Sequence, residues 1–118
     1  MHRYNMAHRG SEEAVLPKAE ALGIPVVAFT CTRWGSLLDG HEDWDSEVPK
    51  AADCYRYVLN HPSVRVALSA PATEAQLREN LQAFSTGLGS TPKQISDRES
   101  YGRLVYGKGT DAFETRWP

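Results

Sequence analysis

The amino-acid sequence predicts an α/β fold built from parallel strands, and three observations carry this prediction. Two short apolar runs rich in β-branched residues, residues 24–30 and 64–69, have the length and composition of buried strands. Segments with helical spacing of apolar residues connect and follow them, and such crossovers imply parallel strands with right-handed connections. Two strands of this kind cannot cover each other. The single 118-residue domain is therefore expected to be a piece of a larger α/β sheet or barrel.

The first helix is predicted to begin near Ser11, which can cap free backbone amides, with two acidic residues in the first turn. Gly23 is the expected stop, because glycine adopts the left-handed conformation that ends many helices. Pro17 interrupts this pattern and favours either a kink or a late start. The apolar positions at helical spacing are Val15, Leu16, Ala19 and Leu22.

Residues 31–49 form a long loop with an acidic stretch from residue 39 to residue 47. Loops of this length are usually functional or disordered, and the acidic part is expected to be solvated surface. A helix over residues 50–60 follows and ends before Pro62, since the residue that precedes a proline avoids helical backbone angles.

The sequence after the second strand predicts two more helices. Thr73 is the expected N-cap of the first, with Gln76 at the capping-box position, and Gly87 is its stop. Its apolar stripe comprises Leu77, Leu81 and Phe84. Thr91 followed by Pro92 starts a last helix that runs toward Tyr101, and a less regular tail follows.

Composition excludes several classes of function. The net charge is −2 and the basic residues are scattered, which argues against a nucleic-acid partner. Neither a bilayer-spanning apolar stretch nor a signal peptide is visible, so we expect no membrane partner and a cytoplasmic location with Cys31 and Cys54 reduced. The spacing of histidines and cysteines gives no metal site. Cys31 follows a strand, but it lacks the flanking glycines of a nucleophile elbow.

Several segments, in the right order, resemble the C-terminal part of the aldo-keto reductase family. Residues 3–12, RYNMAHRGSE, resemble the end of the sixth barrel strand and the turn after it. Residues 22–30, LGIPVVAFT, resemble the seventh strand, and residues 32–38, TRWGSLL, resemble its loop. The other matching segments are residues 54–64, before the eighth strand, residues 76–81, in the last barrel helix, and residues 101–102 and 113–118, in the tail.

The resemblance implies a partial (β/α)₈ barrel containing only the C-terminal βα units, strands six to eight. The family transfers hydride between NADPH or NADH and a small-molecule carbonyl substrate, using loops at the carboxyl ends of the strands. Phe29 matches the position that stacks on the nicotinamide ring. The remaining cofactor-binding candidates are Thr30, Thr32 and Trp34 for the pyrophosphate, and Gln76 and Asn80 for the adenine end.

Each of these residues also has a purely structural interpretation. Phe29 on an apolar strand is equally suited to a core position, and Gln76 to a capping box. Trp34 fits either a substrate-side aromatic residue or an anchor of the loop. Where many relatives carry Lys, Ser or Arg near the 2′-phosphate, this sequence has Ala70, Pro71 and Thr73, so NADPH and NADH both stay open.

No residue is assigned a catalytic role. The family's Asp, Tyr, Lys and His tetrad precedes the sixth strand, and Tyr4, His8 and Lys18 have the right types in the wrong places. The chain is therefore expected not to reduce carbonyls by itself. The alternative is a non-catalytic half-barrel module that associates with itself or with a complementary chain through open sheet edges.

Overall fold

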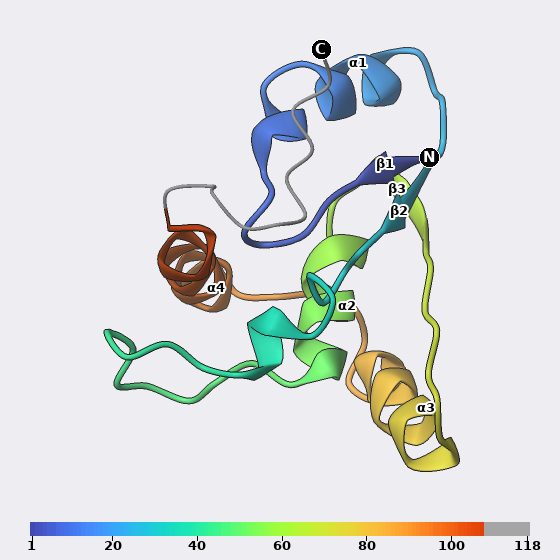
Figure 1. Ribbon diagram of the computed structural model, residues 1–118. Coiled ribbons are helices and arrows are strands. Elements are labelled where there is room, and N and C mark those ends of the chain that lie inside the picture. The colour runs from blue at the N-terminus through green and yellow to red at the C-terminus, as the bar shows by residue number, and fades with distance from the viewer. Residues whose placement is uncertain (108–118) are drawn as a thin grey trace, which may run out of the picture.

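The computed structural model describes residues 1–107 and contains a three-stranded parallel sheet (Figure 1). Its strands lie in the order β1 (His2–Arg3), β2 (Val26–Phe29) and β3 (Val64–Ala67). The register sets Arg3 beside Phe29 and Val27 beside Val66. The parallel pairing of the two predicted strands is confirmed, and β1 is the strand whose end the family resemblance located.

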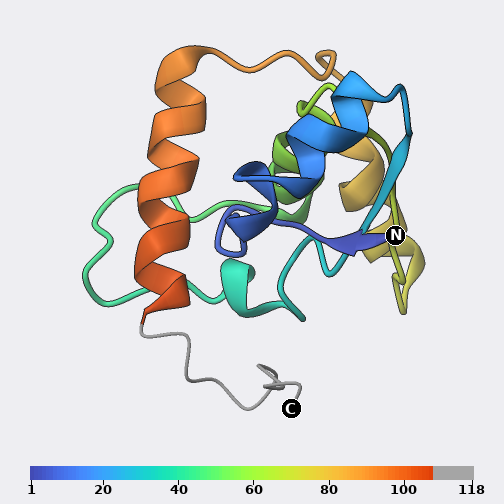
Figure 2. The same cartoon turned by 90° about the horizontal axis from the view of Figure 1, so that it is seen from above.

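Helices make both crossovers and cover one side of the sheet. Viewed from above, α1 and α2 lie on the same side of the strands, and α4 stands beyond them (Figure 2). The α-helices are α1 (Val15–Ala21), α2 (Ala51–Leu59), α3 (Glu74–Leu81) and α4 (Pro92–Tyr106). Three short 3₁₀ turns complete the fold: η1 (Gly10–Glu12), η2 (Ser36–Leu38) and η3 (Gln82–Phe84). Within residues 1–107, no helix has both the length and the apolar character that crossing a bilayer requires.

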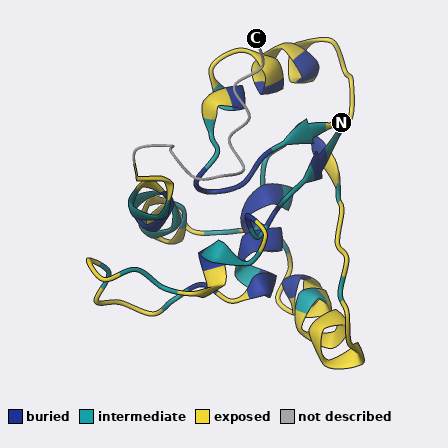
Figure 3. Ribbon diagram, viewed as in Figure 1, coloured by how far each residue is buried: buried dark blue, intermediate teal, exposed yellow. Residues whose placement is uncertain are grey.

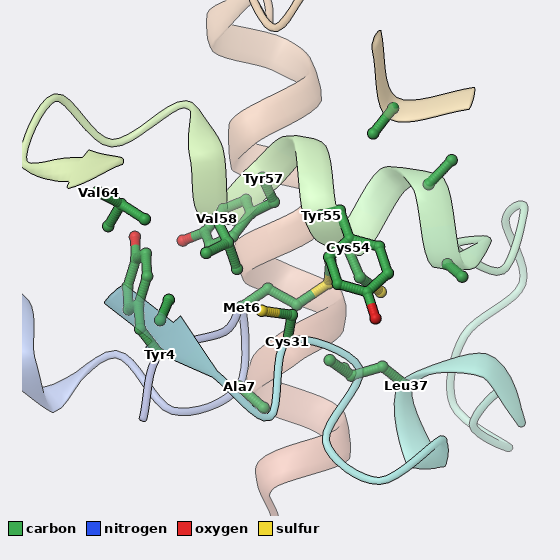
Figure 4. Close-up of a cluster of buried hydrophobic side chains, with 14 of the residues drawn as sticks. Tyr4, Met6, Ala7, Cys31, Leu37, Cys54, Tyr55, Tyr57, Val58 and Val64 are labelled. Carbon is green, nitrogen blue, oxygen red and sulfur yellow. The ribbon is translucent and has the colours of Figure 1, made fainter. Parts of the chain in front are cut away.

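The two faces of the sheet differ in burial. On the helix side, Val26, Ala28 and Val64 are buried, and the core continues through α2 to Tyr4 and Met6 (Figure 4). Strand residues alternate between faces, so Arg3, Val27 and Phe29 belong to the opposite face. On that open face Val66 is 46% exposed. The sheet therefore has one covered and one uncovered apolar face.

The first helix starts later than its predicted cap. Ser11 lies in η1, its hydroxyl caps nothing, and α1 begins only at Val15. Pro17 explains the shift, because the late start makes it the third helical residue. There the amide hydrogen that proline lacks would have no partner within the helix. Gly23 ends the helix region with a φ of 65°, as predicted.

Helix α3 forms where predicted, but its apolar stripe is not buried. Leu77, Leu81 and Phe84 are exposed, and burial coloring shows α3 as mostly exposed beside the mostly buried α2 (Figure 3). A polar contact joins α3 to α2: Glu79 accepts from the amide of Ala51 at 3.3 Å. Helical spacing predicted an apolar side correctly, but within residues 1–107 no element covers it.

Helix α4 is longer than predicted and runs through Gly102 to Tyr106. Gly102 is buried and faces the Met6 carbonyl so closely that a Cβ atom would overlap it. The Tyr101 hydroxyl donates to the Leu37 carbonyl at 3.0 Å. Glycine thus permits close helix packing here instead of ending the helix. Residues 113–118, where the resemblance also covers the tail, lie outside the described residues.

The contact at Gly102 gives a stability prediction. Replacing Gly102 with alanine forces the Met6 backbone and α4 apart, and overpacking of this kind costs about 1–3 kcal/mol of unfolding free energy. Gly89→Ala is the matched control, because a Cβ atom at Gly89 meets no atom within 4 Å. Denaturant melts of both variants test this, and equal stability of the two would contradict the packing described here.

Candidate functional site

The carboxyl ends of the strands meet at one edge of the sheet, and a buried amide joins two of them. Asn5, directly after β1, donates its side-chain amide to the Thr30 carbonyl after β2 at 2.9 Å. Its side-chain oxygen accepts from the backbone amides of Ala7 and His8 at 2.9 and 2.8 Å. The loops that follow β1 and β2 are therefore fixed relative to each other.

The loop after β2 has an unusual backbone. Thr30, Arg33 and Trp34 have positive φ angles of 57°, 51° and 53°, and Gly35 continues with 90°. Non-glycine residues in this region are rare, and each costs on the order of 1–3 kcal/mol, so the surroundings must enforce the conformation. Such strain is concentrated at functional sites in proteins.

Helix α4 holds this loop from outside the sheet. The buried Arg33 side chain donates to the Val105 carbonyl at 2.6 Å near the end of α4, and its guanidinium lies 5.7 Å from the Tyr106 ring centroid. A cation at a helix C-terminus is favoured by the helix dipole. Together with the Tyr101–Leu37 hydrogen bond, this contact fixes the first part of the loop to α4.

The first four predicted cofactor residues lie together at this edge. Phe29 ends β2 on the open face and is half-buried, while Thr30 and Thr32 begin the loop. Trp34 projects from the loop with 48% of its surface exposed. The Thr30 hydroxyl donates to the Phe29 carbonyl at 2.7 Å, so it is available to a ligand mainly as an acceptor.

Gln76 and Asn80 lie apart from that segment, on α3. The side chain of Gln76 accepts from the Ala72 amide at 2.7 Å, and the amide of Gln76 donates to Thr73 at 3.1 Å. This is a helix-start role, although the side-chain bond reaches Ala72 and not the capping-box partner Thr73. Asn80 donates to the Ser69 hydroxyl at 2.8 Å, linking α3 to the end of β3.

A depression of about 950 Å³ runs along the β1 edge of the sheet. Phe29 and Arg3 line it from the open face, and His8 and Tyr106 line it from the loop after β1 and from α4. The family resemblance assigns no role to Arg3 or Tyr106. Strand alternation, which sets Arg3 on the same face as Phe29, was the available signal for Arg3.

A separate polar cluster lies on the covered side of the sheet. The Tyr4 hydroxyl donates to Glu12 at 2.8 Å, and Arg9 binds both Glu12 and Glu99 at 2.8 and 3.1 Å. Burial, with the nearby Tyr57 and Glu12, raises the pKa of Tyr4 well above its usual range. Burial of the Glu12 carboxyl opposes its ionisation, but hydrogen bonds from Arg9 and Tyr4 outweigh this and lower its pKa.

Tyr4 and His8 have residue types that occur in the family's catalytic tetrad, and the structure shows where their side chains lie. Tyr4 points to the helix side and Phe29 to the open face, so the two side chains are separated by the sheet. The His8 ring meets Tyr106 edge-on at 5.4 Å. Among residues 1–107, no three metal-binding side chains gather at one place.

Comparison with known proteins identifies the architecture. No family model and no curated protein sequence matches the chain. Its structure is similar to that of an aldo-keto reductase from Bacillus halodurans, solved in its holo form, with a TM-score of 0.63 and 19% sequence identity. The match covers 84% of this chain and 40% of the reductase, so the chain spans less than half the length of that protein. The chain has the fold of part of an aldo-keto reductase barrel.

Proposed function

We propose that this chain is the C-terminal, cofactor-side part of an aldo-keto reductase that uses NADPH or NADH. The observation that supports it most is the placement of Phe29 and its loop at the carboxyl ends of parallel strands, in a fold similar to a reductase barrel. Active sites of such barrels are built at this end of the strands. Identity of 19% carries the fold alone, so the activity stands as a proposal.

The residues at the edge fit a nicotinamide cofactor. A half-buried phenyl ring on the open face, bordering a depression of about 950 Å³, offers a flat apolar surface for the nicotinamide. Thr30, Thr32 and Trp34 would hold the pyrophosphate, and Gln76 and Asn80 the adenine end. When bound, the cofactor supplies the hydride that a carbonyl substrate accepts, and the chain holds the cofactor in position.

The proposal also includes a reducing, cytoplasmic setting. Cys31 and Cys54 are unpaired and buried, and burial raises the pKa of each thiol to about 12. Neutral buried thiols are unreactive and need no oxidising compartment.

The cofactor assignment predicts a specific loss of binding. Phe29→Ala removes the stacking surface and should weaken NADPH or NADH binding by roughly tenfold, in line with about 1–3 kcal/mol per stacked base. Phe84→Ala is the matched control, since Phe84 is 58% exposed on η3. Calorimetric titration of the 118-residue chain measures both. Unchanged affinity in Phe29→Ala would remove Phe29 from the site.

We further propose that the chain alone does not reduce carbonyls. Carbonyl reduction needs an acid that protonates the developing alkoxide beside the nicotinamide. Tyr4, the nearest tyrosine to Phe29 along the sheet, faces the opposite side and is held by Glu12. Its raised pKa also makes it a poor proton donor.

Activity assays test the absence of turnover directly. The chain mixed with NADPH and a reactive aldehyde should consume no more cofactor than buffer does, followed by loss of absorbance of the reduced nicotinamide. Tyr4→Phe should leave that baseline unchanged. Turnover that the Tyr4→Phe variant loses would show that Tyr4 acts as the acid.

The alternative is a non-catalytic half-barrel module that pairs with itself or with a complementary chain. The specific observation in its favour is exposed apolar surface in two places, on the open face of the sheet and on α3 with the turn that follows it. This surface includes Val66 and Leu68 on and after β3 and Leu77, Leu81 and Phe84 on α3 and η3. Residues 1–107 contain three strands, and a barrel of this type has eight. Five further βα units would therefore close it, whereas a second copy of these three strands would not.

The half-barrel geometry predicts association. Open parallel edges and apolar patches promote pairing, so the chain alone should sediment as oligomers whose size grows with concentration and should melt over a broad range. The double variant Leu77→Ser/Leu81→Ser should shift the population toward monomer. A clean monomer with a sharp melt at tens of micromolar would support a self-sufficient module instead.

A further inference from the structure

Arg3 places a positive charge on the open face of the sheet, beside Phe29 at the edge where the cofactor is proposed to bind. Arg3 is the register partner of Phe29, so both side chains leave the sheet on the same side. Its guanidinium lies 5.0 Å from the centroid of the Trp34 ring. Arg3 is half-buried and lines the same depression as Phe29.

The hydrogen-bonding capacity of Arg3 is unused. Arginine carries five N–H donors in a planar fork. Within residues 1–107 the Arg3 side chain has neither a carboxylate within salt-bridge distance nor a hydrogen-bond acceptor, and it makes a cation–π contact with Trp34. By contrast, Arg9 in the same depression is bound to Glu12 and Glu99. Arg3 can therefore take up an anion without breaking an existing ion pair.

The position of Trp34 indicates which anion. Stacking on the indole face leaves the edges of the guanidinium fork available, and that fork matches phosphate oxygens in a bidentate geometry. Trp34 belongs to the loop proposed to hold the cofactor pyrophosphate, and Phe29 marks the proposed nicotinamide end. An anion bound by Arg3 thus lies between the two.

We propose that Arg3 binds the pyrophosphate of the dinucleotide, with Trp34 fixing the orientation of its guanidinium. This assignment rests on the proposed cofactor function. The shared chemistry is an oxyanion, which a carboxylate substrate also offers, and the two sources are separable by choice of ligand.

The test compares Arg3→Gln and Arg3→Lys with the control Arg65→Gln, which removes an exposed arginine on β3. Calorimetry with NADH, ADP and inorganic pyrophosphate should show a loss of roughly ten- to hundredfold in affinity for Arg3→Gln, the size expected of a bidentate charged contact. Arg3→Lys keeps the charge without the fork and should lie between. Arg65→Gln should bind as the unchanged chain does, and thermal melts should confirm that all variants fold.

The outcomes separate the two proposals. If Phe29→Ala weakens NADH binding but Arg3→Gln does not, the cofactor function stands and the Arg3 assignment is overturned. If the chain binds pyrophosphate through Arg3 but not NADH, the anion site stands and the cofactor function fails. Benzoate, titrated in the same way, is the carboxylate probe: if Arg3→Gln weakens binding of benzoate but not of ADP, the anion is a carboxylate and the pyrophosphate assignment is wrong. Binding of none of the ligands overturns both.

Discussion

The geometry of the candidate site depends on one buried side-chain amide. Asn5 is fully buried, and its side chain accepts from two backbone amides of the turn after β1 and donates to the carbonyl of Thr30. Thr30 is where the backbone turns left-handed into the loop after β2. The same turn presents the Met6 carbonyl to Gly102. Asn5 therefore influences both the path of the loop after β2 and the position of α4. Leaving its buried side-chain amide unpaired would cost about 1–3 kcal/mol of unfolding free energy.

The two sides of the sheet differ in the kind of contacts they make. On the covered side, charges fix the helices: Arg9 joins Glu12 to Glu99 of α4, and Arg98 of α4 lies 3.3 Å from Asp53 of α2. These ion pairs are partly buried, so they specify where α4 sits more than they stabilise the fold. On the open side, the strand residues Val27, Phe29 and Val66 are apolar, and Arg3 is charged. The candidate ligand-binding side chains therefore lie on the side of the sheet that the helices do not cover.

Sequence patterns predicted the elements better than they predicted what the elements contact. Strand length and β-branched composition located β2 and β3, and Gly23 and Pro62 marked helix ends because backbone sterics act locally. The sequence predicts an irregular tail from Gly102, because the tertiary partner of this glycine, the Met6 carbonyl, is nearly a hundred residues away in the sequence. Leu77 illustrates the same limit: its spacing indicated an apolar side, but burial depends on a neighbour that the spacing does not reveal.

The candidate site shows the same difference between what local sequence patterns predict and what tertiary contacts decide. Motif resemblance selected Phe29 and the loop after it, and both lie at the carboxyl edge of the sheet. Arg3 belongs to the matched segment of residues 3–12, but the resemblance gives it no role, and its relation to Phe29 appears only when the strand register is known. Gln76 was predicted both as an adenine-side residue and as the capping-box partner of Thr73, and its side chain accepts from the Ala72 amide rather than from that of Thr73.

The uncovered face of the sheet has a thermodynamic consequence. Apolar surface that is already in water adds nothing to the heat-capacity change of unfolding, which ordinary domains show at about 12–15 cal/mol/K per residue. Val66 and Leu68 are each nearly half exposed before unfolding. The isolated chain therefore has a smaller heat-capacity increment per residue and a flatter dependence of stability on temperature than a closed barrel. Covering that face with further strands makes the curve of unfolding free energy against temperature steeper and also raises its maximum.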